Sequence, residues 1–169
     1  MRVWLGLGSN RQNPSARLRE ALDRLDRVDG VRLTGTSSFY RTPPWGDEEQ
    51  DDFINAVASI ETDVAPFALL AELQAIETRM GRERSTRRWG PRIIDIDLLL
   101  YGDQMYFKDG LEIPHPRMHE RAFVLVPMAE LDASLEVPGH GRVVDLLRDV
   151  DCSDIRRLVG SESLQYEND

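Results

Sequence analysis

The chain has 169 residues, of which 41% are hydrophobic and 30% charged, and its formal net charge is −9. This composition is ordinary for one soluble globular domain, and the length permits a core that needs no disulfide or structural metal. The negative charge disfavours general binding to nucleic acids or anionic membranes, and no apolar run reaches the ~18 residues of a membrane-spanning helix. Because the single cysteine, Cys152, cannot form an internal disulfide, we expect a cytoplasmic protein in a reducing compartment.

The N-terminal segment is predicted to form a strand followed by a helix. Residues 3–8 are a short apolar run, and we interpret the stretch GLGSN at its end mainly as a strand-to-helix turn. This stretch lacks the lysine of a phosphate-binding P-loop. Asn13 can cap the following helix, with Pro14 at the first helical position and apolar residues at helical spacing behind it.

The next segments predict two strands with a loop between them, and then a second helix. Residues 31–42 alternate in polarity and are rich in β-forming residues, so we expect one strand there. Residues 43–52 contain two prolines, a glycine and a run of acids, which predicts a loop before the strand at 53–62. An amphipathic helix is expected over 65–81, with Pro66 in its first turn.

The second half of the chain contains the most strongly apolar strand, which we expect at 93–101. A polar, hairpin-like region follows over 102–113. Residues 115–132 predict a turn and then a helix that is interrupted near Pro127. The remainder predicts a short strand and a short helix around 143–149.

The order of these elements is β-α-β-β-α-β followed by an appendage, which is the order of the ferredoxin-like split βαβ fold in the α+β class. It predicts an antiparallel sheet with two helices on one face and C-terminal additions. We expect a single domain over residues 1–150 and an acidic C-terminal tail over 151–169 that frays. The fold alone does not define a function.

Two aspartates interrupt the apolar strand at 93–101. Side chains alternate along a strand, so Asp95 and Asp97 share one face while Ile96 and Leu98 share the other. The aspartate backbones then lie roughly 7 Å apart, which allows their carboxylates to converge on one or two hard cations such as Mg²⁺. The pattern by itself also fits a solvated polar face.

An unusual cluster of arginines directly precedes this strand. Five arginines stand within residues 82–92 of an acidic chain. The planar guanidinium fork matches phosphate oxygens, and glycine and proline residues punctuate the segment as they do in hinged lids. A solvated basic loop is the alternative. Together with the aspartate pair, the segment indicates a site for a magnesium-bound nucleotide.

Five segments of the chain, in the correct order, match the motifs of one family. They are GLGSN (6–10), SSFYRTPPWG (37–46), FINAV (53–57), RWGPRIIDIDLLLY (88–101) and IPHPRMHERAFVL (113–125). The chain thereby resembles the 6-hydroxymethyl-7,8-dihydropterin pyrophosphokinases of folate biosynthesis, over its length to about residue 150. The resemblance implies transfer of the β,γ-diphosphate of ATP to the hydroxymethyl group of 6-hydroxymethyl-7,8-dihydropterin, with AMP as the second product.

The resemblance also implies roles for individual residues. The implied catalytic residues are Arg82, Arg92, Asp95 and Asp97, and the two aspartates are implied to bind two Mg²⁺ ions together with ATP. The implied ATP-binding residues are Gln74, Glu77, Arg84, Arg87, Arg88, Trp89, Ile96, Leu98, His115 and Arg121. The implied pterin-binding residues are Thr42, Pro43, Pro44, Trp45, Phe53, Asn55 and Phe123. ATP and the pterin are the expected partners of a monomer that binds neither nucleic acid nor membrane.

Two other functions are compatible with the fold. A ferredoxin-like nucleic-acid-binding module would present arginines and aromatic rings, but the acidic charge and the lack of an RNP-type aromatic motif argue against it. A regulatory domain without catalysis would not need the intact pair of Asp95 and Asp97. Without the resemblance, Phe53 and Phe123 would be interpreted as core residues and His115 as a structural histidine.

Overall fold

The computed structural model of the chain describes residues 1–44, 49–83 and 91–159. Its elements in chain order are β1 (Arg2–Ser9), α1 (Pro14–Asp26), β2 (Val31–Thr36), β3 (Tyr40–Thr42), β4 (Phe53–Thr62), α2 (Pro66–Arg79), β5 (Asp95–Tyr101), β6 (Tyr106–Lys108), β7 (Leu111–Ile113), the 3₁₀ turn η1 (Met118–Glu120), α3 (Ala122–Asp132), β8 (Glu136–Val137), β9 (Gly141–Arg142), α4 (Val143–Leu146), the 3₁₀ turn η2 (Leu147–Asp149) and β10 (Arg156–Arg157).

The main sheet has the strand order β10-β3-β4-β1-β5, and β2 also pairs with β4. Every pairing in it is antiparallel. Each βαβ half is split by a strand of the other half: β4 lies between β1 and the β2–β3 segment, and β1 lies between β4 and β5. The predicted ferredoxin-like fold is therefore confirmed.

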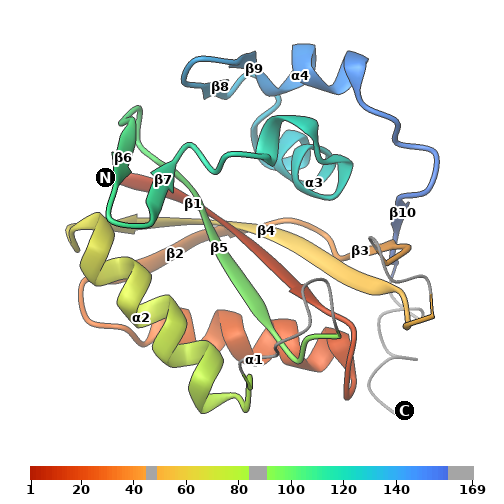
Figure 1. Cartoon of the computed structure of the whole chain (residues 1–169), viewed down its shortest axis with the longest axis horizontal. Coiled ribbons are helices and arrows are strands. Elements are labelled where there is room, and N and C mark those ends of the chain that lie inside the picture. Colours follow the sequence, from red (N-terminus) through yellow and green to blue (C-terminus); the bar gives the residue numbers. More distant parts are fainter. Residues whose placement is uncertain (45–48, 84–90, 160–169) are drawn as a thin grey trace.

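The two faces of the sheet are covered by different parts of the chain (Figure 1). Helices α1 and α2 pack on one face, where their leucines meet alternate residues of β1, β4 and β5. Helix α3 and the segments after it form a second apolar cluster on the opposite face, around Trp4, Val57 and Leu100. Within the described ranges, none of the helices has the length and apolar character needed to cross a bilayer.

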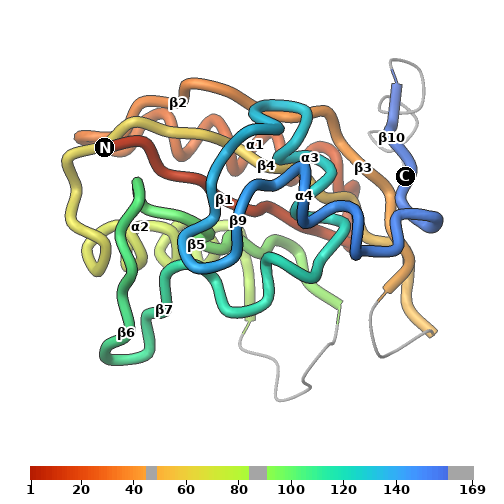
Figure 2. The backbone as a smooth tube through the Cα atoms, turned by 90° about the horizontal axis from the view of Figure 1, so that it is seen from above, coloured from red at the N-terminus to blue at the C-terminus, as the bar shows by residue number. Residues whose placement is uncertain are grey.

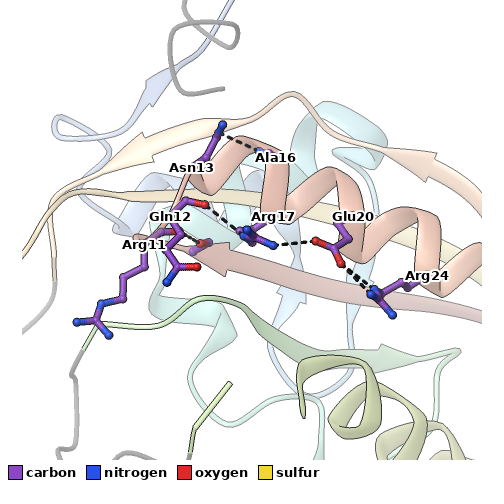
Figure 3. Close-up of polar contacts among 8 residues, drawn as sticks. Arg11, Gln12, Asn13, Ala16, Arg17, Glu20 and Arg24 are labelled. Carbon is purple, nitrogen blue, oxygen red and sulfur yellow. Dashed lines mark hydrogen bonds and ion pairs between the residues drawn. The ribbon is translucent and has the colours of Figure 1, made fainter. Parts of the chain in front are cut away.

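The local sequence explains where α1 begins. The Asn13 side-chain oxygen accepts a hydrogen bond from the Ala16 backbone nitrogen at 3.4 Å, which confirms the predicted cap (Figure 3). Along the exposed side of α1, Glu20 accepts hydrogen bonds from Arg17 at 2.9 Å and from Arg24 at 2.9 and 3.0 Å (Figure 3). Pairs of this kind contribute only ~0.3–0.5 kcal/mol each, so the apolar face of α1 supplies most of its stabilisation.

The segment 31–42 forms two strands, and the prediction of one continuous strand is wrong. Between β2 and β3, the Ser37 side-chain oxygen accepts a hydrogen bond from the Val57 backbone nitrogen at 2.9 Å. This hydroxyl takes the place of a backbone carbonyl in the ladder, so the chain can leave the regular strand and rejoin β4 at Tyr40.

The prediction of an interruption near Pro127 is also wrong. Helix α3 runs without a break from Ala122 to Asp132, with Pro127 inside it. A proline lacks the backbone N–H, so it removes the one bond that would reach the carbonyl of Phe123, four residues earlier. Pro127 is buried, and its helix neighbours Val124, Leu125 and Met128 belong to the apolar cluster on this face of the sheet. We infer that their packing keeps the helix continuous across that gap.

The C-terminal segment that was expected to fray contains a short strand, β10, within the described residues. β10 pairs with β3, opposite Tyr40 and Arg41. Figure 2 shows this strand beside β3 at one end of the sheet. The Leu158 backbone nitrogen then donates to Phe39 at 2.8 Å, and the Leu158 side chain joins the core. Residues 160–169 lie outside the described residues.

This packing predicts that the C-terminal strand stabilises the fold. Replacing Leu158, which is 6% exposed, with alanine should lower the free energy of unfolding by roughly 2–4 kcal/mol. Its neighbour Val159 is 59% exposed, and Val159→Ala should change the free energy by less than ~0.5 kcal/mol. Denaturant titration of both variants gives the comparison, and equal stabilities would mean that this strand contributes nothing.

Candidate active site

A cavity of about 230 Å³ opens on the face of the sheet that α3 covers only in part. We call it the site cavity. It lies over strands β4 and β1 and the edge strand β5, beside the start of α3. Its lining consists of Gly6, Leu7, Gly8, Thr42, Pro43, Phe53, Asn55, Ala56, Arg92, Asp95, Asp97, His115, Arg121, Phe123 and Val124.

The floor of the site cavity depends on two glycines, Gly6 and Gly8, that both lie inside β1. The predicted strand at 3–8 contains them, whereas the interpretation of GLGSN as a strand-to-helix turn is wrong for them. A Cβ atom on Gly8 would lie 2.8 Å from the side-chain oxygen of Asn55. The absence of a side chain at Gly8 therefore leaves room for the Asn55 amide. The usable signal in the sequence was the period of two that places Trp4, Gly6 and Gly8 on one face.

Asp95 and Asp97 project into the site cavity from β5, which is an edge strand of the sheet. Ile96 and Leu98 point to the opposite face and join the core under α1 and α2. This alternation was predicted from the sequence. Burial and the nearby charge of Asp95 raise the pKa of Asp97 above its ordinary value. The environment of Asp97 thus favours either a proton or a neighbouring cation.

Two arginines neutralise Asp95 in this structure. Arg82 donates to one Asp95 carboxylate oxygen at 2.9 Å, and Arg92 donates to the other at 2.8 Å. Both arginines were predicted to contact phosphate. Arg92 lines the site cavity, whereas Arg82 is not part of the lining and reaches it through its bond to Asp95. Each guanidinium can also donate to a phosphate oxygen in place of a carboxylate oxygen, because both match its planar fork.

Glu77 holds this arrangement from α2. Its carboxylate accepts a hydrogen bond from the backbone nitrogen of Ile96 at 2.7 Å and pairs with Arg82 at 2.5 Å. The Ile96 N–H is on the free edge of β5, so Glu77 satisfies a donor that has no partner strand. Burial raises the pKa of Glu77. Both partners of Glu77, the Ile96 backbone and Arg82, are protein groups, so Glu77 positions β5 and Arg82 beside the site cavity.

A second set of hydrogen bonds, which sequence reasoning missed, fixes the backbone of Arg92. The Asn10 backbone nitrogen donates to the Arg92 carbonyl at 3.1 Å, and the Asn10 side-chain oxygen accepts from the Arg92 nitrogen at 2.9 Å. The Asn10 amide nitrogen donates in turn to Gln50 and to the carbonyl of Asp51, at 2.9 and 3.1 Å. Asn10, directly after β1, is therefore hydrogen-bonded to two distant segments, one at Gln50 and Asp51 and the other at Arg92.

His115 and Arg121 line the same end of the site cavity. Burial, together with the positive charge of Arg121, lowers the pKa of His115 to about 4. The imidazole is therefore neutral at neutral pH. Its Nδ1 atom accepts a hydrogen bond from the Arg117 backbone nitrogen at 3.2 Å, which leaves the other ring nitrogen to donate.

The opposite end of the site cavity combines aromatic rings with an amide. Asn55 donates from its side chain to the Thr42 hydroxyl at 2.8 Å, and both residues are buried. Phe53 and Phe123 lie on the cavity wall, from β4 and the start of α3. The guanidinium of Arg121 lies 5.4 Å from the centre of the Phe123 ring. An aromatic wall beside fixed polar groups suits a flat heterocycle.

Some predicted site residues lie elsewhere. Gln74 is exposed on α2, and it is not part of the cavity lining. Pro44 and the side chains of Ile96 and Leu98 are also absent from the lining. The predicted roles of Trp45, Arg84, Arg87, Arg88 and Trp89 fall on residues outside those that the structure describes.

The donor set at Asp95 and Asp97 fits magnesium. Over residues 1–44, 49–83 and 91–159, no group of three or more His, Cys, Asp or Glu side chains is arranged to hold a metal. Magnesium commonly takes one or two protein carboxylates and completes its shell with water and phosphate oxygens. The two carboxylates of β5 supply that number, and the raised pKa of Asp97, which is caused first by burial, favours a bound cation beside it.

Carboxylates and arginines at one end, and aromatic rings with an amide at the other, define an enzyme that transfers a phosphate-containing group to a flat acceptor. Residues 4–133 match the sequence profile described as 7,8-dihydro-6-hydroxymethylpterin-pyrophosphokinase. The chain belongs to this family. The activity of the family is ATP-dependent transfer of a diphosphate group to hydroxymethyldihydropterin in folate biosynthesis, and this chain is a pyrophosphokinase.

Curated relatives support the assignment. A 2-amino-4-hydroxy-6-hydroxymethyldihydropteridine pyrophosphokinase from Methylorubrum extorquens is 45% identical over 157 residues, which are 93% of this chain and 98% of the relative. The protein of the same name from Haemophilus influenzae is 43% identical, over 86% of this chain and 91% of its own length. The one from Pseudomonas aeruginosa is 41% identical, over 95% and 98% of the two chains.

Solved structures support the fold. Plasmodium falciparum HPPK-DHPS with pteroate superposes with a TM-score of 0.70 at 15% identity, over 88% of this chain and 42% of that chain. A second HPPK-DHPS, crystallised with substrates, has a TM-score of 0.73 at 14% identity and covers 94% of this chain and 47% of its own. This chain therefore spans under half the length of these solved chains.

The glycine floor gives a specific prediction. Gly8→Ala should displace the Asn55 amide and weaken pterin binding about 10-fold or more, since overpacking costs ~1–3 kcal/mol. Gly35→Ala is the matched control, because its Cβ would approach the Ser59 hydroxyl at 2.9 Å on the same sheet but away from the site cavity. Calorimetric titration with the pterin measures both. Equal pterin affinity in the two variants would show that Gly8 does not act through Asn55.

Proposed function

We propose that the site cavity binds ATP at its carboxylate end and 6-hydroxymethyl-7,8-dihydropterin at its aromatic end, so that the hydroxyl of the pterin meets the β-phosphate between them. The observation that carries this proposal is that one continuous cavity joins Asp95 and Asp97 to Asn55 and Phe53. A site for either substrate alone would need only one of these ends.

At the carboxylate end, we assign the phosphate contacts to arginines and a histidine. Arg82 and Arg92 can pass from Asp95 to phosphate oxygens, because both acceptors match the guanidinium fork. Arg121 and the neutral imidazole of His115 lie at the same end of the site cavity. These donors are positioned to stabilise the negative charge that shifts during phosphoryl transfer.

Asp95 and Asp97 would hold Mg²⁺ ions that enter with ATP, and we propose two such ions. When bound, the metal would neutralise phosphate charge and act as a Lewis acid at the transferring group. The chain contributes two carboxylates on one face of β5, and Glu77 keeps that strand edge in place through Ile96. Gln74 and the arginines and tryptophan at 84, 87, 88 and 89 remain predicted nucleotide contacts.

At the aromatic end, Asn55 and Thr42 would read the polar edge of the pterin. An amide offers donors and an acceptor, which an aminopyrimidinone ring can match. Asn55 is fixed in place by its hydrogen bond to Thr42 and by the space over Gly8. Phe53 and Phe123 would contact the faces of the ring, with Pro43, Pro44 and Trp45 completing the predicted pocket.

The reaction then needs positioning more than a strong base. A bond forms between the hydroxymethyl oxygen of the pterin and the β-phosphorus, and the bond from that phosphorus to the α,β-bridging oxygen breaks. AMP leaves, and the hydroxyl proton is lost to solvent. In a loose phosphoryl-type transition state, most of the catalysis comes from holding the two substrates in line and balancing charge.

Three further expectations go with this function and remain predictions. We expect one catalytic domain over residues 1–150, with β10 packed against it, and we expect it to act as a monomer in the cytoplasm. Gel filtration at working concentration tests the oligomeric state.

Asp97→Asn tests the proposed carboxylate site. It should lower turnover by at least about 10²-fold, since one preorganised electrostatic group commonly contributes that much. Because the pKa of Asp97 is raised in the folded protein, its charged form destabilises the fold above pH ~4. The variant should therefore be at least as stable as wild type at pH 7 without metal, and this difference should vanish as the pH falls toward 4.

Turnover and thermal unfolding from pH 4 to 8 measure both effects. Asp103→Asn is the matched control, because Asp103 is an exposed aspartate in the turn directly after β5. Normal magnesium-dependent turnover in Asp97→Asn would overturn the proposed site. If Asp97→Asn is much less stable than wild type at pH 7, the charged form of Asp97 does not destabilise the folded protein, and this assignment is wrong.

A further inference from the structure

Glu130, near the end of α3, lies outside the site cavity and is joined to the chain between β2 and β3. One of its carboxylate oxygens accepts hydrogen bonds from the Ser38 backbone nitrogen at 3.0 Å and the Ser38 hydroxyl at 2.7 Å. The other oxygen accepts from the Ser38 nitrogen at 3.1 Å and from the Tyr40 phenol at 2.5 Å. Arg157 of β10 approaches the same carboxylate at 3.8 Å.

The donors to Glu130 are rigidly connected to the pterin end of the site cavity. Tyr40 is buried, and it lies opposite Asn55 in the pairing of β3 with β4. Thr42 lies opposite Phe53 in the same ladder and accepts the hydrogen bond from Asn55. Burial and the bond to Glu130 raise the pKa of Tyr40 to about 12, so the phenol keeps its proton and remains a donor at every working pH.

Glu130 is also connected through α3 to Phe123, which lies on the aromatic wall of the site cavity. Phe123 and Glu130 are seven residues apart on α3, which is close to two helical turns and places them on the same side of the helix. Val124 and Phe123 of α3 line the site cavity. A displacement of α3 relative to β3 would therefore change the spacing between Phe123 and the wall formed by Thr42 and Asn55.

We propose that Glu130 is a positioning residue for the pterin site, in which its carboxylate fixes the spacing between α3 and β3. The inference rests on the proposed function only in assigning the pterin to this end of the site cavity. Glu130 touches neither substrate. Its loss should widen or loosen the aromatic pocket. It should leave Asp95 and Asp97 of β5, and Arg82 and Arg92 before that strand, unchanged.

The test compares the binding of the two substrates in a set of variants. Glu130→Ala should raise the Kd for hydroxymethyldihydropterin about 10-fold, measured by calorimetry with a non-hydrolysable ATP analogue present. The Kd for the analogue should stay within about twofold of wild type, and kcat at saturating pterin within about threefold. Glu130→Gln keeps one side-chain acceptor and should recover part of the pterin affinity. Tyr40→Phe, which removes one donor, should show a smaller loss of the same kind.

Asp132→Ala is the control on the same helix. Asp132 pairs with Arg2 at 3.4 Å and accepts from Ser134, and it makes no contact with β3 among the described residues, so its pterin Kd should equal that of wild type. Pterin affinity in Glu130→Ala within twofold of wild type would overturn the proposal. So would equal losses for pterin and nucleotide, because a general loss of folding would weaken both. If Glu130→Ala does not fold, Glu130→Gln and Tyr40→Phe decide by the same two affinities.

Asn55→Ala in the same titration separates this proposal from the proposed function. If Asn55→Ala loses pterin binding while Glu130→Ala keeps it, only the role of Glu130 fails. If Asn55→Ala binds the pterin as wild type does, the assignment of the pterin to this end of the site cavity fails.

Discussion

The structure depends on positive charge that offsets three carboxylates at the edge of the sheet. Asp95 and Asp97 enter the site cavity from β5, and Glu77 reaches the same strand from α2. Such a group of carboxylates is costly unless cations accompany it. Arg82 and Arg92 supply this charge from the two sides of the segment before β5. The same need for positive charge supports the proposed binding of magnesium and phosphate at this site.

One face of the sheet carries the main hydrophobic core, and the other face carries the site cavity. The face under α1 and α2 is filled by Leu, Ile and Val side chains from every central strand. On the other face, β5 carries aspartates at its start and apolar residues after a register shift near Leu99, where the cluster under α3 begins. The site cavity is the part of this face left uncovered. Its floor can be open because β1 contributes glycines there, at Gly6 and Gly8.

The fold and the shared face of the two aspartates could be predicted because they depend on local patterns, whereas the other predicted site residues came from the family resemblance. The period of two placed Asp95 and Asp97 on one face, and element order gave the split βαβ sheet. Contacts between distant segments could not be predicted from local signals: Asn10 with Arg92, Glu77 with Ile96, and Glu130 with Tyr40. β10 was missed because it is stabilised by pairing with β3 and by burial of Leu158. The polar composition of the tail gives no local signal for either.

The central claim is that the two ends of the site cavity do separate work, with charge at one end and recognition at the other. The most direct test measures the single-turnover rate and the pterin Kd of Arg92→Ala and Asn55→Ala side by side. The account predicts that Arg92→Ala lowers the rate by about 10²–10³-fold with little change in pterin Kd, and that Asn55→Ala loses affinity first. The opposite pattern, with pterin affinity lost in Arg92→Ala and its chemical rate retained, would contradict the division.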